Sequence, residues 1–424
     1  MKGKYKNKKV LIMAGKPIAS KDIVLYLNKN GAHTIVTDNL PVSESPAKKL
    51  SYDAWDISTA DVDIIVNKCK KERVNAVFTG IHEYNIWRTL DVCEALNLPF
   101  YASREDMLNT SLKSRYKALF RKFDIPVVPE IPSIEDVNKT DYPVLVKPVD
   151  GSGGYGISIC YDEVELRKGY KNALEVSILK KALIEKFIDA REVTIFYILQ
   201  NGKIMLSALA NRNTGNGDKY TIPLPVLYIF PSQHLNNYIK KLNNKVIAAF
   251  NSIGLKNGMI FIQSFIDNDE FMFYDIGFRL TGTQEYHILE HICEYNPLEM
   301  MVDYALTKEM GDRDIKHLVD PYFRNKYAFN ITFLAMPCTI KEYLGIEEAR
   351  KMPGVLRVIE NHEVGTTIPQ SALGTLNQVV VRVLAVCNSK AEMIELIKVV
   401  TEKIDVISTE GNSVVMPGYN LDEL

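Results

Sequence analysis

The stretch that decides the fold is VLVKPVDGSGGYGI, residues 144–157, in which an apolar run ends in a glycine-rich loop. Glycines 151, 153 and 156 form a GxGxxG pattern. A dinucleotide-binding fingerprint needs a helix after such a loop, because the helix N-terminus holds the pyrophosphate. Here the loop is followed by ISICYD, whose β-branched residues predict a strand. The unit is therefore strand, glycine loop, strand, and a Rossmann interpretation is excluded.

A loop of this kind between antiparallel strands can fold over a triphosphate. Its backbone N–H groups supply donors, and glycines permit positive φ and close approach. Protein kinases place their lysine after such a loop, whereas Lys147 precedes it here, and neither HRD, DFG nor the P-loop pattern GxxxxGK[ST] occurs. The alternative is that DGSGGYG is only a long hairpin turn.

The region before this stretch alternates apolar runs with amphipathic segments over residues 9–105, beginning with KVLIMAG and SKDIVLYLNKNG. This alternation predicts βαβ units and a parallel sheet. Gly15 and Ser20 lie in the first strand-to-helix turn, where an open sheet of this type usually offers its crevice.

The region after this stretch does not continue the βαβ alternation. The runs at 140–207 predict a small antiparallel lid of strands with one helix near residues 163–173. The strands MIFIQSFID and EFMFYDIGF flank Asn268-Asp269, which predicts a hairpin. QVVVRVLAVC, residues 378–387, is uniformly apolar and should be a central strand.

Bulk composition excludes several classes of protein. The 424 residues contain 51 basic and 52 acidic side chains, for a formal charge of -1, so no global field favours nucleic acid or a membrane surface. No window approaches the ~20 apolar residues that span a bilayer. The six cysteines are scattered without a CxxC pair, which is typical of a reducing compartment. We expect a cytoplasmic protein.

VLVKPVDGSGGYGI, then ALIEKFIDAREV (182–193), then FYDIGFRLTG (273–282) resemble the ATP-grasp superfamily in order and spacing. The resemblance is to its carboxylate–amine ligases, such as L-amino-acid ligases, and more distantly to carbamoyl-phosphate synthase large chains and biotin carboxylases. It implies a mixed α/β and α+β fold. The implied units are an N-terminal parallel-sheet domain (1–108), a helical connector (109–139), a glycine-loop lid (140–207), a core with the metal site (208–325) and a C-terminal α+β cap (326–424).

The resemblance implies that two lysines bind ATP phosphates. One stands 13 residues before the proline of FDIP, which is Pro126, and Lys113 has that offset. The other precedes the glycine loop, and Lys147 matches it. The backbone of Ser152, Gly153 and Gly154 would cover the triphosphate. For Lys113 the alternative is an ordinary solvated helix lysine.

The resemblance also implies an adenosine site. Glu185 and the backbone of Lys186, Phe187 and Ile188 would read the adenine edge. Glu192, seven residues after Glu185, would accept hydrogen bonds from the ribose hydroxyls. The alternative is two surface glutamates on an edge strand.

The match is damaged at the metal site. The family has a glutamate on one hairpin strand and E-x-N-x-R twelve residues later, because Mg²⁺ beside a triphosphate prefers negative oxygen ligands. This chain has Gln263, Asp275, Gly277 and Arg279 at these positions. We expect Asp275 and Gln263 to hold one Mg²⁺, with Glu285 as a candidate replacement carboxylate. Arg279 should hold acyl phosphate oxygens, and Lys147 should share in catalysis.

The implied reaction joins a small-molecule carboxylate to an amine. The carboxylate attacks the γ-phosphate of ATP, and the amine then displaces phosphate from the acyl phosphate. Glu83 and the neighbouring His82 follow a predicted strand and could hold substrate, although a capping or core role is equally consistent. A homodimer is compatible with the resemblance. Nucleic acid and membranes are not expected partners.

Two alternatives to the ligase stay open. The altered metal site could bind nucleotide without turnover. A bicarbonate-using enzyme is the other alternative, although carbamoyl-phosphate synthases usually carry a duplicated chain and biotin carboxylases keep intact two-metal ligands.

Overall fold

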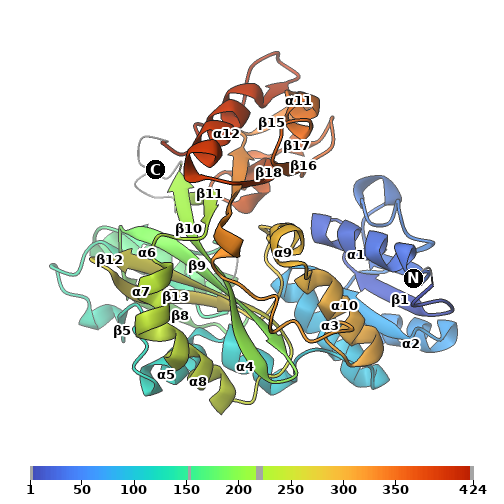
Figure 1. The fold of residues 1–424 in the computed structure, drawn as a ribbon. Coiled ribbons are helices and arrows are strands. Elements are labelled where there is room, and N and C mark those ends of the chain that lie inside the picture. Colours follow the sequence, from blue (N-terminus) through green and yellow to red (C-terminus); the bar gives the residue numbers. More distant parts are fainter. Residues whose placement is uncertain (1–2, 151–153, 216–222, 421–424) are drawn as a thin grey trace.

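The computed structural model describes residues 3–150, 154–215 and 223–420. The N-terminal unit is a parallel sheet in the order β3-β2-β1-β4 (Figure 1), which confirms the parallel sheet predicted from the alternating pattern. Its strands are β1 (Lys9–Met13), β2 (His33–Asp38), β3 (Asp53–Asp56) and β4 (Ala76–Thr79). The connecting helices are α1 (Ile18–Lys29), α2 (Val62–Glu72) and α3 (Glu83–Leu96).

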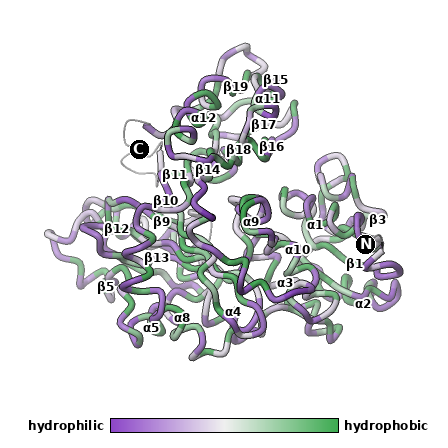
Figure 2. Tube along the Cα trace, viewed as in Figure 1, coloured by the Kyte–Doolittle hydropathy of each residue, from purple (hydrophilic) through white to green (hydrophobic). Residues whose placement is uncertain are grey.

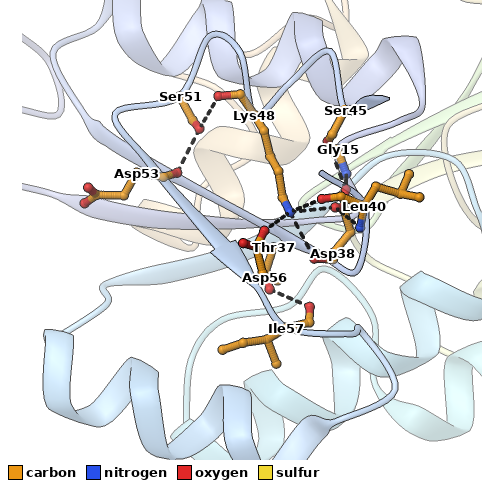
Figure 3. Close-up of polar contacts among 10 residues, drawn as sticks. All are labelled: Gly15, Thr37, Asp38, Leu40, Ser45, Lys48, Ser51, Asp53, Asp56 and Ile57. Atoms are coloured by element: carbon orange, nitrogen blue, oxygen red, sulfur yellow. Dashed lines mark hydrogen bonds and ion pairs between the residues drawn. The ribbon is translucent and has the colours of Figure 1, made fainter. Parts of the chain in front are cut away.

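Polar side chains surround Gly15 in the turn after β1, and the crevice expected there stays a prediction. Figure 3 shows the Asp38 carboxylate accepting from the Gly15 amide at 2.8 Å and from the Ser45 hydroxyl at 3.0 Å. The Lys48 ammonium lies 2.9 Å from carboxylate oxygens of both Asp38 and Asp56. A Cβ added to Gly15 would lie 2.2 Å from the Ser45 hydroxyl oxygen. The charges and donors around Gly15 therefore satisfy one another.

Two helices, α4 (Arg104–Ser111) and α5 (Lys113–Lys122), lead to a small antiparallel sheet in the order β5-β8-β6-β7. Its strands are β5 (Glu130–Ile131), β6 (Val144–Pro148), β7 (Ser158–Cys160) and β8 (Ala182–Lys186), and α6 (Glu163–Val176) packs on β6 and β7. The glycine loop therefore connects two antiparallel strands, β6 and β7, as the sequence predicts.

The central sheet has the order β13-β12-β9-β10-β11-β14-β18-β16. Its strands are β9 (Arg191–Gln200), β10 (Lys203–Gly215), β11 (Leu224–Phe230), β12 (Gly258–Asp267), β13 (Glu270–Gly277), β14 (Tyr327–Leu334), β16 (Val355–Glu360) and β18 (Val379–Cys387). The sequence pattern assigns β9 and the start of β10 to the lid. Instead, β9 pairs with β10 on one side and with β12 on the other, because a strand as apolar as β9 is buried between two neighbours.

The predicted hairpin and the predicted central strand are both confirmed. β12 and β13 are joined at Asn268 and Asp269, which have φ of 48° and 62°. β18 lies between β14 and β16 with all nine residues buried. The same sheet thus extends from the hairpin into the C-terminal region, which the sequence pattern presents as a separate cap.

The remaining α-helices and strands lie outside the three sheets described so far. They are α7 (Leu235–Tyr238), α8 (Asn244–Ser252), α9 (Tyr286–Cys293), α10 (Pro297–Thr307), β15 (Cys338–Leu344), α11 (Ile346–Arg350), β17 (Thr367–Ile368), α12 (Lys390–Lys403) and β19 (Asp405–Ser408). β17, β15 and β19 form a third antiparallel sheet. Hydrophobic residues, green in Figure 2, are spread along all these units. Within the described residues no helix is long and apolar enough to cross a membrane.

Candidate active site

Three lysines and one glutamate form the centre of the candidate site. Helix α5 carries Lys113 and Lys117 one turn apart, and β6 supplies Lys147. The two oxygens of the Glu185 carboxylate, on β8, lie 2.5 Å from the Lys117 ammonium and 2.7 Å from the Lys147 ammonium. Lys117 also lies 2.9 Å from Glu130. Cations from two elements, α5 and β6, therefore share the buried Glu185 carboxylate.

Burial and neighbouring positive charges both act on the Lys147 ammonium. Burial lowers the pKa of Lys147, and the like charges of Lys113 and Lys117 lower it further, against the opposing attraction of Glu185. The Lys147 ammonium also donates to the Tyr274 carbonyl at 3.3 Å. An anion with several charges, such as a polyphosphate, would relieve this repulsion.

A β-bulge brings the predicted metal positions to this cluster. Gln263 pairs with Asp275 across the hairpin, but the next pair is Ser264 with Phe273, so Tyr274 is an extra residue in β13. Bulges bend a strand and redirect its side chains, and they are frequent beside active sites. The Asp275 carboxylate lies 3.8 Å from the Lys113 ammonium.

Tyr274 connects the bulge to Glu192. Its hydroxyl donates to the Glu192 carboxylate at 2.5 Å, and the Arg212 guanidinium bonds the same oxygen. Burial alone would lower the Arg212 pKa, but Glu192, together with Tyr274 and Tyr228, raises it above its ordinary value. Glu192 is thus held in a fixed position beside the cluster, and its ribose role stays a prediction.

Of the three backbone amides of Lys186–Ile188, two are paired with described residues. The Lys186 amide donates to the Pro129 carbonyl at 3.2 Å and the Phe187 amide to the Pro143 carbonyl at 3.4 Å. The Ile188 amide has no partner among the residues that the structure describes. Glu185, in contrast, points its carboxylate at the lysines, so its predicted contact with adenine stays untested.

The glycine loop is anchored at both ends. The Asp150 carboxylate accepts from the Ser177 hydroxyl at 2.6 Å and from the Leu179 amide at 3.0 Å. Gly156 has φ of 74°, and a Cβ there would lie 2.9 Å from the Pro148 ring. Gly154 has φ of 85°, and a Cβ added there would meet no atom of the described residues within 4 Å. Ser152 and Gly153, predicted to bind ATP, lie outside the described residues.

The predicted catalytic arginine meets a predicted substrate residue. The Arg279 Nε donates to the Glu83 carboxylate at 3.1 Å, and the Ser111 hydroxyl donates to the other Glu83 oxygen at 2.9 Å. The Arg279 guanidinium also lies over the Phe261 ring, 4.8 Å from its centre. Burial, with the nearby Arg279 charge, lowers the pKa of His82. The first residue of α3 therefore positions the arginine at the end of β13.

The Phe261 ring also accounts for the glycine at position 277. Phe261 pairs with Gly277 across the hairpin, and a Cβ at 277 would lie 2.4 Å from the Phe261 ring. The ring occupies the space that a side chain at 277 would need. The position where the family has an asparagine is therefore closed to any side-chain ligand by packing.

Glu285, the candidate replacement carboxylate, is buried. The hydroxyls of Thr281 and Thr283 both bond its Oε2, and burial raises its pKa. Across the described ranges no group of three or more His, Cys, Asp or Glu side chains gathers as a metal site. Glu285 therefore does not complete a carboxylate cluster with Asp275.

The donor set fits a nucleotide-bound Mg²⁺ better than a free one. Asp275 offers a half-exposed carboxylate, and the partly exposed Gln263 offers a neutral amide oxygen. Mg²⁺ commonly takes one or two protein carboxylates and completes its shell with phosphates and water. One carboxylate beside three lysines fits a Mg²⁺ ion that arrives with a polyphosphate.

Sequence reasoning misses Lys117, Tyr274 and Arg212. In the sequence Lys117 is only a neighbour of Lys113, although its i, i+4 spacing places it on the same helix face. The bulge at Tyr274 has no sequence signal, because it is defined by pairing with β12.

Comparison with known proteins identifies the fold. Residues 113–306 match the family model described as carbamoyl-phosphate synthase L chain, ATP binding domain. The carbamoyl phosphate synthase large chain of Clostridium botulinum (strain Langeland) is 26% identical over 280 residues. That match covers 61% of this chain and 25% of the relative. The chain thus spans about a quarter of the length of these curated relatives.

Solved structures match nearly the whole chain at low identity. The L-amino acid ligase from Bacillus licheniformis superposes with a TM-score of 0.75 at 18% identity, covering 95% of this chain and 99% of the other. The biotin carboxylase domain of the Hydrogenobacter thermophilus 2-oxoglutarate carboxylase superposes with a TM-score of 0.76 at 18% identity. That match covers 96% of this chain and 91% of the other. The resemblance to ATP-grasp proteins and the predicted mixed α/β fold are confirmed.

Proposed function

We propose that this ATP-grasp chain is a carboxylate–amine ligase, which uses ATP to activate a small-molecule carboxylate and joins it to an amine. The observation that carries the proposal is the convergence of Lys113, Lys117 and Lys147 with Asp275 at the bulged hairpin. The three lysines offer positive charge for the phosphates of a triphosphate, and the Asp275 carboxylate offers a ligand for the Mg²⁺ bound to it.

In this proposal the nucleotide lies between the small sheet and the hairpin. Lys113 and Lys147 bind its phosphates, together with the backbone of the glycine loop. The backbone of Lys186–Ile188 reads the adenine edge, and the Ile188 amide is the available donor. Glu192 accepts from the ribose, while Glu185 holds the lysines in place. The N-terminal unit (1–108) and the helical connector (109–139) remain part of the proposal, whereas β9 and β10 belong to the central sheet rather than to the lid.

Asp275 and Gln263 would hold Mg²⁺. When bound there, the ion would neutralise phosphate charge, which is its usual contribution to phosphoryl transfer. We propose one such ion, because Gly277 has no side chain and Phe261 closes its surroundings.

The chemistry proceeds in two steps. A carboxylate oxygen of the substrate attacks the γ-phosphorus, which gives an acyl phosphate and ADP. The amine nitrogen then attacks the acyl carbon, phosphate leaves, and the amine loses a proton. Arg279 is oriented by Glu83 and by the Phe261 ring, so it is preorganised to bind oxygens of the acyl phosphate. No protein nucleophile is required.

Two other functions are supported by specific observations. The closed position at Gly277 favours a nucleotide-binding protein without turnover. The similarity to carbamoyl phosphate synthase chains and to the biotin carboxylase domain favours bicarbonate as the carboxylate.

Release of ADP and phosphate separates these functions. The protein is incubated with ATP and Mg²⁺, with single carboxylates, with bicarbonate, and with or without hydroxylamine as a general amine. Hydroxamate formation that depends on an organic carboxylate supports the ligase. ADP release with bicarbonate alone supports a carboxylase-type reaction. Saturable ATP binding with no ADP release under any condition supports the binding protein.

We also propose that the protein is cytoplasmic and forms a homodimer. All six cysteines are unpaired, which suits a reducing compartment. The similar biotin carboxylase domain from Hydrogenobacter thermophilus is a dimer in its crystal structure. Light scattering of the purified chain tests the oligomeric state.

A further inference from the structure

Arg382, in β18, carries a buried charge with no acidic partner. Its side chain bonds the Thr332 hydroxyl at 2.7 Å, and the residue is 6% exposed. Over the described ranges, no carboxylate lies within 4.0 Å of its guanidinium. Burial lowers its pKa, which means that the charge is poorly compensated. A buried guanidinium in this state is suited to bind an anion.

Two buried acceptors nearby lack donors. The Glu285 carboxylate uses Oε2 for the hydroxyls of Thr281 and Thr283, while its Oε1 has no partner among the described residues. Asn330 donates from Nδ2 to the Thr283 carbonyl at 2.5 Å, and its Oδ1 likewise has no described partner. Buried acceptors without donors are costly, so a ligand group with several N–H bonds would stabilise them.

These groups share one side of the central sheet. Thr332 pairs directly with Arg382, and Asn330 lies two residues from Thr332, so all three side chains lie on one face. The Asn330–Thr283 bond fixes the segment before α9 over that face. The charge of Glu285 acts on Arg382, yet the two are not in contact as an ion pair. Opposite charges thus face the same region without neutralising each other.

The same face leads to the proposed nucleotide site. Asn330 pairs with Tyr228 and Tyr228 with Arg212. Arg212 pairs in turn with Glu192, and Glu192 is two residues from Thr194, which pairs with Gln263. A polar row therefore crosses the sheet from the metal positions to Arg382. Arg279 and Glu285 are in addition six residues apart on one loop.

We propose that Arg382, Glu285 and Asn330 bind an α-amino acid, the guanidinium holding its carboxylate and the two acceptors holding its ammonium group. The inference rests on the proposed function and specifies its substrate. As long as Glu285 holds the amino group as ammonium, that nitrogen carries no lone pair and does not attack. In this assignment the amino acid supplies the carboxylate that is phosphorylated, and the product keeps a free amino group.

Binding to the unmodified protein gives the first test. Each of the twenty L-amino acids is titrated calorimetrically into the protein with ADP and Mg²⁺. The best binder is then compared with its N-acetyl form and its des-amino acid, for example L-alanine with N-acetyl-L-alanine and propionate. We expect at least about tenfold weaker binding of both analogues, since each loses a charged hydrogen-bonding group. Equal binding of the des-amino acid would overturn the inference.

Variants provide the second test. Glu285→Gln should bring the amino acid and its des-amino analogue to similar affinity, and Arg382→Met should weaken both by about 10- to 100-fold. The affinity of both variants for ADP should change less than about threefold. Retained ADP binding also shows that the variants are folded. The exposed Arg357→Met on the neighbouring strand β16 is the matched control. A Glu285→Gln variant that keeps full preference for the amino acid contradicts the assignment.

Turnover separates this inference from the proposed function. If the amino acid binds with the expected preference but no ADP or hydroxamate forms, the ligase proposal fails and the amino-acid site stands. If hydroxamate forms from carboxylates with no preference for an α-amino group, the ligase stands and this site is refuted.

Discussion

The ammonium of Lys147 lies 2.7 Å from the carboxylate of Glu185, and the other oxygen of that carboxylate contacts Lys117 at 2.5 Å. Lys117 is completely buried and Glu185 is 2% exposed. One carboxylate thus keeps two cations in place at the surface that faces the bulged hairpin. The charge balance of the candidate site depends on it.

Glu185→Gln should strongly destabilise the protein. It removes the charge that compensates Lys117 and Lys147, and breaking one side of a buried ion pair costs about 3–5 kcal/mol. Urea unfolding of the variant should show this loss, with Glu175→Gln on the exposed face of α6 as the control. Because Lys147 would then be repelled by its neighbours alone, added ATP and Mg²⁺ should restore more stability to the variant than to the parent.

Lys147→Met and Arg279→Met should have different effects. Lys147 would contact the phosphates of bound ATP, so its loss should raise the Kd for ATP by about 10- to 100-fold. Arg279 would act on charge that develops during transfer, so its loss should lower kcat by about 100-fold or more with little change in ATP affinity. Calorimetry and ADP release measure the two quantities. The opposite pattern would show that the roles are exchanged.

Asp275→Asn should abolish turnover and remove the Mg²⁺ dependence of ATP binding. It is the only carboxylate at the family's metal positions, and an amide attracts a divalent ion weakly. ATP titrations at several Mg²⁺ concentrations report the change, and Asp267→Asn at the exposed end of β12 is the control. Gln263→Glu should tighten Mg²⁺ binding. A metal that binds unchanged in Asp275→Asn would contradict the predicted ligand.

Gly277→Asn should not restore a second metal site. The added Cβ would lie 2.4 Å from the Phe261 ring, so the variant should lose about 1–3 kcal/mol of stability from overpacking. The double variant Phe261→Ala with Gly277→Asn removes the clash and should be less destabilised than the sum of both changes. Thermal unfolding measures both. A stable single variant with increased Mg²⁺ affinity would refute this explanation of the glycine.

Glu299→Gln should stabilise the protein at pH 8 but not at pH 4.5. Burial first, then the charges of Glu290 and Asp303, raises the Glu299 pKa to about 7. Between its ordinary pKa and about 7 the folded chain binds more protons than the unfolded chain, so this group makes stability fall as pH rises. The gain at pH 8 should be about 1 kcal/mol, reduced by partial solvent exposure. Unfolding at the two pH values measures it.

Local patterns alone predicted much of the architecture. The β-branched run after the glycine loop identified a strand, and β7 is there. The Asn268-Asp269 turn between apolar runs identified the hairpin, and the apolar run at 378–387 identified a central strand. These features are readable because backbone propensity and apolar periodicity act over a few residues. The limit of the lid was less predictable, since an apolar strand such as β9 can join either of two sheets.

The chemistry of the candidate site depends on contacts between distant segments. Lys117 meets Glu185 across 68 residues, and Arg279 meets Glu83 across 196. The sequence alone determined that a glycine loop lies between strands and that lysines and altered metal positions accompany it. Only the tertiary structure decided that Glu185 holds two lysines, that Phe261 fills the space beside Gly277, and that Arg382 and Glu285 face the same region. Pairing and packing between remote segments fix these relationships, and no local pattern records them.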